Sequence, residues 1–185
     1  MSEDEILLAV LDRLDRLGIP YMLVGSYASN VHGQPRATHD ADVVVEVDPD
    51  AADSFIGAFE DDFSFNPDSI RMHIYGRSMF NVISYRSPFK IDIIPRRDTP
   101  YHLEEWNRRM RVRAFGRELT VATAEDTIIT KLKWFRQGGE TSGRQLEDAR
   151  GVYAVQEGSI DDAYLDRWAT AEGVGDLLDR IRSGR

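Results

Sequence analysis

Hydrophobic residues recur every three or four positions near the start of the chain, with charged residues between them. The apolar positions are Ile6, Leu7, Val10, Leu11, Leu14 and Leu17. Residues at this spacing share one face of a helix, so the pattern predicts an amphipathic helix that ends at Gly18. The apolar run at residues 21–24 predicts a strand. Gly25-Ser26 then breaks the run, and residues 27–31 predict a short helix.

The middle of the chain mixes strand-like and helix-like patterns. Runs rich in β-branched and aromatic residues predict strands at residues 43–47, 72–75, 79–85 and 89–94. Asp48-Pro49 predicts a helix cap followed by the first residue of a helix that reaches residue 59. Residues 99–110 predict a further helix, and the runs on either side of Gly116 predict a hairpin.

From residue 122 onward the pattern is entirely helical. Thr123 with Asp126 three residues later is typical of a helix start. Helices are predicted over residues 124–135, 145–156, 160–171 and 174–182. The sequence therefore predicts an α/β (α+β) core at residues 1–121 and a C-terminal helical region at residues 122–185.

Composition narrows the class of protein. The chain has 185 residues, of which 42% are hydrophobic, enough for a real core and too many for a disordered segment. It has no cysteine, which excludes disulfide scaffolds, cysteine-ligated zinc and thiol catalysis. No apolar run is long enough to span a bilayer, and residues 1–5 are acidic rather than basic. We therefore expect a cytoplasmic protein that does not contact a membrane.

The net charge is −9, which disfavours broad, non-specific binding to nucleic acid and suits a soluble surface. Basic residues are nevertheless clustered at Arg108, Arg109, Arg111 and Arg113. This cluster either guides RNA or a phosphate tail, or forms a solvated charged face.

Two carboxylates stand side by side where a buried strand begins. Asp40 and Asp42 are two residues apart, so they project from the same face of the strand. Like charges this close are costly unless a cation lies between them, and Mg²⁺ prefers carboxylate oxygen. The spacing alone is not specific, because Asp48 and Asp50 share it at the predicted helix cap.

A third carboxylate, Asp92, interrupts the apolar run at residues 89–94 and needs a partner there. It either forms a salt bridge with an arginine, faces water on an edge strand, or completes a three-carboxylate site with Asp40 and Asp42. Such a site suits two metal ions about 3.5–4 Å apart, as used for in-line displacement at phosphorus. Gly25-Ser26 either approaches a phosphate at a helix N-terminus or is an ordinary strand-to-helix turn.

Taken together, Gly25-Ser26 and the segment Arg36-x-Thr38-x-Asp40-x-Asp42 resemble the signature of the DNA polymerase β-like nucleotidyltransferase superfamily. The form is similar to the small prokaryotic branch that includes the AbiEii-type toxins, and Asp92 matches the third carboxylate of that family in kind and order. The resemblance continues through two further elements, which are Thr127-x-x-x-Lys131 and Arg144-x-x-x-Asp148.

The resemblance implies a nucleotidyltransferase-like mixed sheet flanked by helices, with a helical region that closes over a nucleotide. It implies transfer of a nucleotidyl group from an NTP to an acceptor hydroxyl, with release of pyrophosphate. Mg²⁺ (or Mn²⁺) would be held by the catalytic residues Asp40, Asp42 and Asp92. The nucleotide would be bound by Gly25, Ser26, Thr127, Lys131 and Asp148.

Helical spacing adds expectations for the second half. Thr127 and Lys131 are four residues apart, so they lie on one helix face, where Lys131 is expected to meet the β- or γ-phosphate. Lys133 then points elsewhere. Arg144 and Asp148 are also four apart and can pair with each other. The alternative is that Lys131 and Asp148 are only surface ion-pair partners.

The acceptor stays open. RNA, tRNA above all, or a protein would suit a toxin-like enzyme with an antitoxin partner. A small molecule such as an aminoglycoside would suit an antibiotic-resistance enzyme. Two non-enzymatic alternatives are a nucleotide-binding protein of the same fold and an arginine-rich RNA-binding module, which the net charge of −9 disfavours.

Overall fold

The computed structural model describes residues 2–184, so Met1 and Arg185 of the two predicted regions lie outside it. The described chain forms one seven-stranded sheet in the order β3-β4-β5-β2-β1-β7-β6. The strands are β1 (Tyr21–Val24), β2 (Asp40–Val45), β3 (Phe63–Ser64), β4 (Phe80–Ser84), β5 (Lys90–Pro95), β6 (Met110–Ala114) and β7 (Arg117–Val121). β2 pairs with β5, and β1 with β7, in parallel, and the other pairs are antiparallel. The predicted mixed sheet is confirmed.

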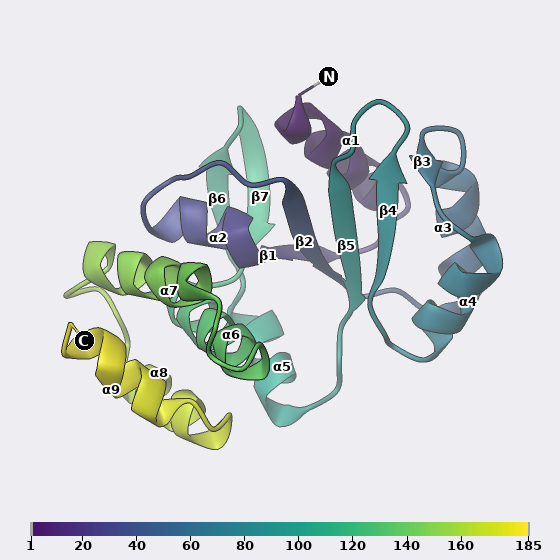
Figure 1. The fold of residues 1–185 in the computed structure, drawn as a ribbon. Coiled ribbons are helices and arrows are strands. Elements are labelled where there is room, and N and C mark those ends of the chain that lie inside the picture. Colours follow the sequence, from purple (N-terminus) through teal and green to yellow (C-terminus); the bar gives the residue numbers. More distant parts are fainter. Residues whose placement is uncertain (1, 185) are drawn as a thin grey trace.

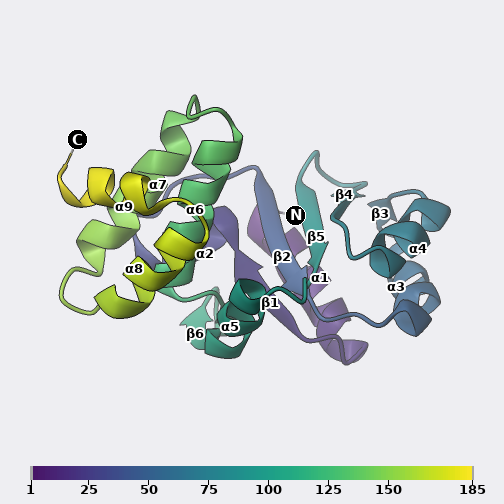
Figure 2. The same cartoon turned by 90° about the horizontal axis from the view of Figure 1, so that it is seen from below.

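Helices flank this sheet. They are α1 (Glu3–Arg16), α2 (Gly25–His32), α3 (Ala52–Phe59), α4 (Pro67–Tyr75), α5 (Pro100–Arg108), α6 (Ala124–Gln137), α7 (Gly143–Val155), α8 (Asp162–Ala171) and α9 (Gly175–Arg182). Figures 1 and 2 both show α6–α9 gathered at one end of the molecule, with α3 and α4 at the other. None of the helices within residues 2–184 combines the length and apolarity needed to cross a membrane.

The two faces of the sheet differ because successive strand residues point to opposite sides. On β2, Ala41, Val43 and Val45 join the main hydrophobic core, which also contains the buried residues of α1, α3 and α4. The alternate positions, Asp40, Asp42 and Val44, face the other side, where Val44 packs with Trp106 of α5. The carboxylates therefore lie on the face that the main core does not use.

A second core joins the C-terminal helices. Ile128 and Leu132 of α6 pack with Leu165 of α8 and Leu178 of α9, and Tyr101 of α5 belongs to the same cluster. α2 packs against both α6 and α7 and so links the sheet to the helical part. Tyr101 precedes residue 121 but packs in this second core. The division of the chain at residue 121 stays a prediction.

Two local expectations were wrong. Residues 72–75 are the end of α4 and not a strand: Asn66 accepts a hydrogen bond from the Ser69 N–H, and Pro67 occupies the first turn. Ile70 and Ile74 are four residues apart on the buried face of this helix, and a window of four residues is too short to show that period. Asp48 does precede a short 3₁₀ turn (Pro49–Ala51) with Pro49 in its first turn, but its side chain makes no cap hydrogen bond, and α3 begins only after this turn.

Candidate active site

The three predicted carboxylates come together on two neighbouring strands. In the parallel register of β2 and β5, Asp42 lies opposite Asp92, and Asp40 lies opposite Lys90. All four residues occupy alternate positions and therefore share one face of the sheet. The sequence reasoning did not include Lys90 in this group, because its spacing from Asp40 and Asp42 becomes meaningful only once the register is known.

The carboxylates of this group disfavour one another's ionisation. Burial raises the pKa of Asp42 to about 7, and the charges of Asp92 and Asp40 add to the rise. The Lys90 ammonium lies 2.8 Å from Asp92 Oδ2, and this hydrogen bond raises the pKa of Lys90. The other oxygen, Asp92 Oδ1, is buried without a hydrogen-bond partner among residues 2–184. Within residues 2–184, Asp92 is thus paired with a lysine on one oxygen and lacks a hydrogen-bond partner on the other.

These residues suit a divalent cation in their chemistry. All three acids offer the hard oxygen donors that Mg²⁺ and Mn²⁺ take. A cation among them would satisfy Asp92 Oδ1 and favour the ionised form of Asp42. Within the described residues, however, no three Asp, Glu or His side chains are already arranged to hold a metal ion. A metal would therefore require side chains of this group to move.

A tight turn leads from β1 into α2 beside the carboxylates. Gly25 has a φ of +63°, which favours glycine. A Cβ at this position would overlap the Asp42 carboxylate, so only glycine lets the turn approach Asp42 this closely. Ser26 follows in the first turn of α2, where backbone N–H groups are free to bind an anion.

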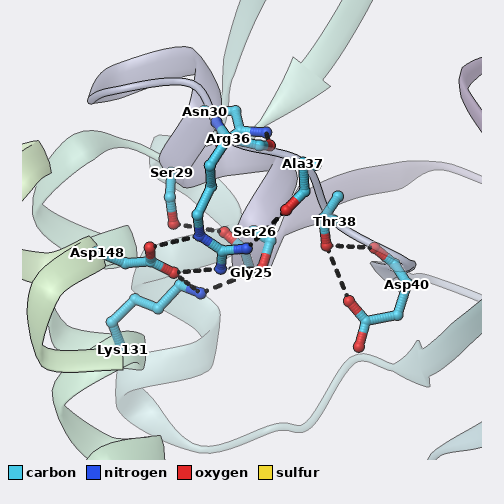
Figure 3. Close-up of polar contacts among 10 residues, drawn as sticks. All are labelled: Gly25, Ser26, Ser29, Asn30, Arg36, Ala37, Thr38, Asp40, Lys131 and Asp148. Carbon is cyan, nitrogen blue, oxygen red and sulfur yellow. Dashed lines mark hydrogen bonds and ion pairs between the residues drawn. The ribbon is translucent and has the colours of Figure 1, made fainter. Parts of the chain in front are cut away.

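A network of charged residues ties Ser26 to the helical part (Figure 3). Arg36 donates to both oxygens of Asp148, at 2.8 and 2.7 Å, and Lys131 Nζ donates to Asp148 Oδ2 at 2.7 Å. Ser26 Oγ accepts from Arg36 at 3.0 Å and from Lys131 at 3.4 Å. Asp40 lies on the other side of Ser26 in this view, where Thr38 donates to it.

Lys131 and Asp148 are not surface partners. Lys131 is fully buried, and burial lowers its pKa against the opposing effect of Asp148. Burial by itself would raise the pKa of Asp148, but the hydrogen bonds from Arg36 and Lys131 lower it below its usual range. The expected pair of Arg144 with Asp148 was wrong, since Arg36, distant in sequence, takes both carboxylate oxygens together with Lys131.

Thr127, the other nucleotide-site residue predicted on α6, is engaged differently from Lys131. The Thr127 hydroxyl is buried and donates to the Thr123 carbonyl at 2.7 Å, so it serves α6 itself. Lys133 does point away from Lys131, as expected, and pairs with Glu172. Arg36 was quoted in the sequence motif but was not assigned a site role. Its place at the start of the Arg-x-Thr-x-Asp-x-Asp motif was the sequence signal that could have marked it as a site residue.

Two cavities flank the carboxylate group. A polar one of about 380 Å³ has Ser26, Arg36, Thr38, Asp40, Lys90 and Arg144 among its lining residues. A second one of about 390 Å³ includes Asp42 and Asp92 in its lining. Its walls include the apolar and aromatic side chains Val24, Val44, Ile94, Tyr101 and Trp134. The carboxylates therefore lie between a basic, polar hollow and a mainly apolar one.

The second cavity adds residues that sequence reasoning missed. Trp134 lines this cavity and is only partly buried, whereas Trp106 and Trp168 are buried. Glu105 of α5 also lines it, and burial, together with the charge of Asp126, raises the pKa of Glu105 to about 8. No local pattern marks Glu105, because its surroundings come from α6.

Comparison with known proteins places the fold. No protein-family model matches the chain, and no curated protein sequence matches it. Among solved structures, an antigenic nucleotidyltransferase-like protein from Paracoccidioides brasiliensis aligns with a TM-score of 0.57 at 16% identity, over 96% of this chain and 91% of that one. The lincosamide antibiotic adenylyltransferase LnuA, with lincomycin bound, aligns with a TM-score of 0.57 at 14% identity, over 84% of this chain and 98% of that one.

A third similar structure is ANT(2'')-Ia in complex with adenylyl-2''-tobramycin. It aligns with a TM-score of 0.56 at 14% identity, over 97% of this chain and 96% of that one. Identities this low establish the fold alone. The chain therefore has a nucleotidyltransferase-like fold, as the sequence predicted, while the AbiEii-type branch is not supported by these matches.

Proposed function

We propose that this protein is a metal-dependent nucleotidyltransferase that moves a nucleotidyl group from an NTP to an acceptor hydroxyl and releases pyrophosphate. One observation carries the proposal. In a nucleotidyltransferase-like fold, Asp40, Asp42 and Asp92 share one face of two adjacent strands, next to the Gly25-Ser26 turn. A carboxylate group of this kind suits phosphoryl chemistry assisted by metal ions.

The polar cavity suits the triphosphate. Ser26 offers a hydroxyl and the first N–H groups of α2, and Arg36, Lys90 and Arg144 add positive charge to the lining. Bound Mg²⁺ or Mn²⁺ supplies charge neutralisation at the reacting phosphate and at the leaving pyrophosphate. Asp40, Asp42 and Asp92 would hold it. Lys131 adds its positive charge next to Ser26, and its hydrogen bond to the Ser26 hydroxyl would hold that hydroxyl in place.

The second cavity suits the acceptor. In-line displacement requires the attacking hydroxyl to approach the phosphorus from the side opposite the leaving group. With the triphosphate in the polar cavity, the acceptor would approach from the cavity lined by Asp42 and Asp92, whose apolar and aromatic walls suit a base or a ring system.

The acceptor itself is RNA, a protein or a small molecule. Two proteins of similar fold are named for antibiotic chemistry, a lincosamide adenylyltransferase and a complex with adenylyl-2''-tobramycin, which favours testing small molecules first. A toxin-like role on RNA, with an antitoxin partner, stays a prediction from the sequence resemblance. Arg108 and Arg109 weigh little in its favour, since both stack on aromatic rings, of Tyr164 and Trp106 respectively.

The proposal is tested with NTPs labelled at the α- or the γ-phosphate, in the presence of Mg²⁺. Aminoglycosides, lincosamides, total RNA and cell protein are offered as acceptors. We expect transfer of the α-label and none of the γ-label, because pyrophosphate leaves. Asp40→Asn should abolish transfer, whereas Asp50→Asn should not, since Asp50 is an exposed acid with the same spacing from Asp48. NTP binding without transfer to any acceptor would favour the non-catalytic alternative.

A further inference from the structure

Lys90 forms an ion pair with a carboxylate of the proposed metal site, and the proposed reaction gives it no specific step. It lies two residues before Asp92 on β5, so both side chains leave the same face of the strand. Its ammonium is 2.8 Å from Asp92 Oδ2, and its neighbour across the sheet is Asp40. A positive charge of the protein's own therefore already lies among the acids that would hold a metal.

The ammonium and a divalent cation compete for the same carboxylate. Asp92 Oδ2 pairs with Lys90, whereas Asp92 Oδ1 is buried without a hydrogen-bond partner in the part of the chain that the structure describes. A metal that binds Asp92 gains Oδ1 freely, but it must share the carboxylate with a nearby like charge unless Lys90 leaves. Binding of a metal alone is thus opposed by Lys90.

The Lys90 ammonium has a second site available when it leaves Asp92. Its side chain is 40% exposed, unlike that of Asp92, at 9%. It also lines the polar cavity beside Ser26 and Arg36, where the triphosphate is proposed to bind. A phosphate oxygen there would replace Asp92 as the partner of the ammonium, at the cost of a side-chain rotation rather than a movement of the strand.

We propose that Lys90 is a displaceable counter-ion: its ammonium neutralises Asp92 in the free protein and passes to the NTP phosphates when a divalent cation binds. This inference rests on the proposed function and adds a coupling to it. Without nucleotide, a metal releases Lys90 from its ion pair and leaves it without a partner. With nucleotide, the ammonium gains one. Metal and nucleotide therefore strengthen each other's binding, by an equal factor in each direction.

The test measures binding of Mn²⁺ to the full chain from the electron paramagnetic resonance signal of the free ion, with and without a non-hydrolysable ATP analogue. Lys90→Met should bind Mn²⁺ about tenfold more tightly than the unchanged protein when nucleotide is absent. The tightening of Mn²⁺ binding by the analogue should shrink in this variant. Complex formation between Mn²⁺ and the analogue in solution is the same for both proteins and cancels in the comparison.

Two control variants separate charge from packing. Lys90→Arg keeps the positive charge and should retain the weak Mn²⁺ binding of the unchanged protein. Arg71→Met removes an exposed cation of α4 that pairs with Asp53 and Asp68, and it should not alter Mn²⁺ binding. If Lys90→Met binds Mn²⁺ no more tightly than the unchanged protein, the counter-ion role is wrong. Lys90→Gln repeats the test if the methionine variant folds poorly.

Failure of the proposed function would look different. Asp42→Asn should lose Mn²⁺ binding whether or not Lys90 acts as a counter-ion. If the unchanged protein and Asp42→Asn bind Mn²⁺ equally with nucleotide present, the metal site itself is wrong. If only the Lys90 variants behave unexpectedly, the metal site stands and the counter-ion inference alone falls.

Discussion

Two clusters of charged residues flank Ser26, and they differ in how completely their charges are paired. In the first, Asp148 is paired on both oxygens, and the buried Lys131 and the arginine Arg36 share it. In the second, Asp42 has a pKa raised to about 7, and Asp92 Oδ1 has no partner in the described part of the chain. Both clusters are held by well-packed elements, α6 and α7 in one case and β2 and β5 in the other.

The difference separates a structural role from a binding role. Buried charges persist without a ligand when oppositely charged partners and hydrogen bonds surround them, as they do around Asp148. A cluster of like charges with an unsatisfied oxygen lowers stability and is retained where a ligand supplies the missing charge. Removal of one acidic charge should therefore have opposite effects on stability in the two clusters.

The largest expected effect is that of Asp42→Asn on the proposed activity. Loss of one metal-binding charge should reduce nucleotidyl transfer by at least about 1,000-fold, equivalent to about 4 kcal/mol of transition-state stabilisation. The metal-free variant should nevertheless be more stable than the unchanged protein at pH 8. Urea unfolding in the presence of a chelator measures this. A less stable Asp42→Asn would contradict the contrast between the clusters.

The direction of this stability change follows from proton binding at Asp42. Burial raises the pKa of Asp42 from an ordinary 3.8 to about 7, so the folded chain binds a proton more tightly than the unfolded chain does. Stability from this group is therefore present below about pH 4 and falls as pH rises towards 7. The whole shift corresponds to at most about 4 kcal/mol. Asp42→Asn should flatten the pH dependence of unfolding over that interval.

Asp148→Ala should act in the opposite direction. It leaves Lys131 buried without its counter-ion, which typically costs about 3–5 kcal/mol of unfolding free energy. Asp176→Ala is the matched control, because Asp176 pairs with Arg136 at an exposed position and should cost less than about 1 kcal/mol. Urea unfolding of both variants decides the matter. Equal, small losses would mean that the Asp148 cluster does not hold α7 against α2.

Gly25→Ala tests how closely the carboxylate cluster depends on the turn before α2. Its Cβ would overlap the Asp42 carboxylate and would need a φ of +63°. Gly116→Ala is the control, since Gly116 has a φ of +77° with open space around it. The control should lose about 1 kcal/mol of stability from backbone strain alone. Gly25→Ala should lose about 1 kcal/mol more and also weaken Mn²⁺ binding, which Gly116→Ala should not.

Much of this arrangement could be predicted from local sequence. Alternation along residues 40–45 indicates a strand with Asp40 and Asp42 on one face, and the position of Asp92 in an apolar run indicates a group that needs a partner. These predictions rest on side-chain spacings of two residues in a strand and four residues in a helix, and such spacings relate residues of a single element. The fold class follows from the order of those elements and is confirmed.

What local sequence could not supply is pairing between distant elements. Arg36 meets Asp148 across more than a hundred residues, and the nearer Arg144, at helical spacing, was preferred for that reason. Asp92 lies opposite Asp42, and Lys90 opposite Asp40, because β5 pairs with β2 in one particular register. Trp134 lines a cavity, although its place on an amphipathic helix is typical of a core residue.

The smallest expected effect is a pH dependence of metal affinity, and it bears directly on the unsatisfied cluster. With a pKa of about 7, Asp42 is largely protonated at pH 6, so Mg²⁺ or Mn²⁺ has to displace a proton to bind. Affinity should therefore rise with pH, by up to tenfold per unit below about pH 7, and level off above pH 8. Titration of Mn²⁺ into the nucleotide-free protein at pH 6, 7 and 8 measures the slope. Asp40→Asn should keep part of this slope, because Asp42 still carries the proton. An affinity that is constant from pH 6 to 8 would mean that Asp42 is ionised throughout, and the contrast with the fully paired Asp148 would then rest on Asp92 alone.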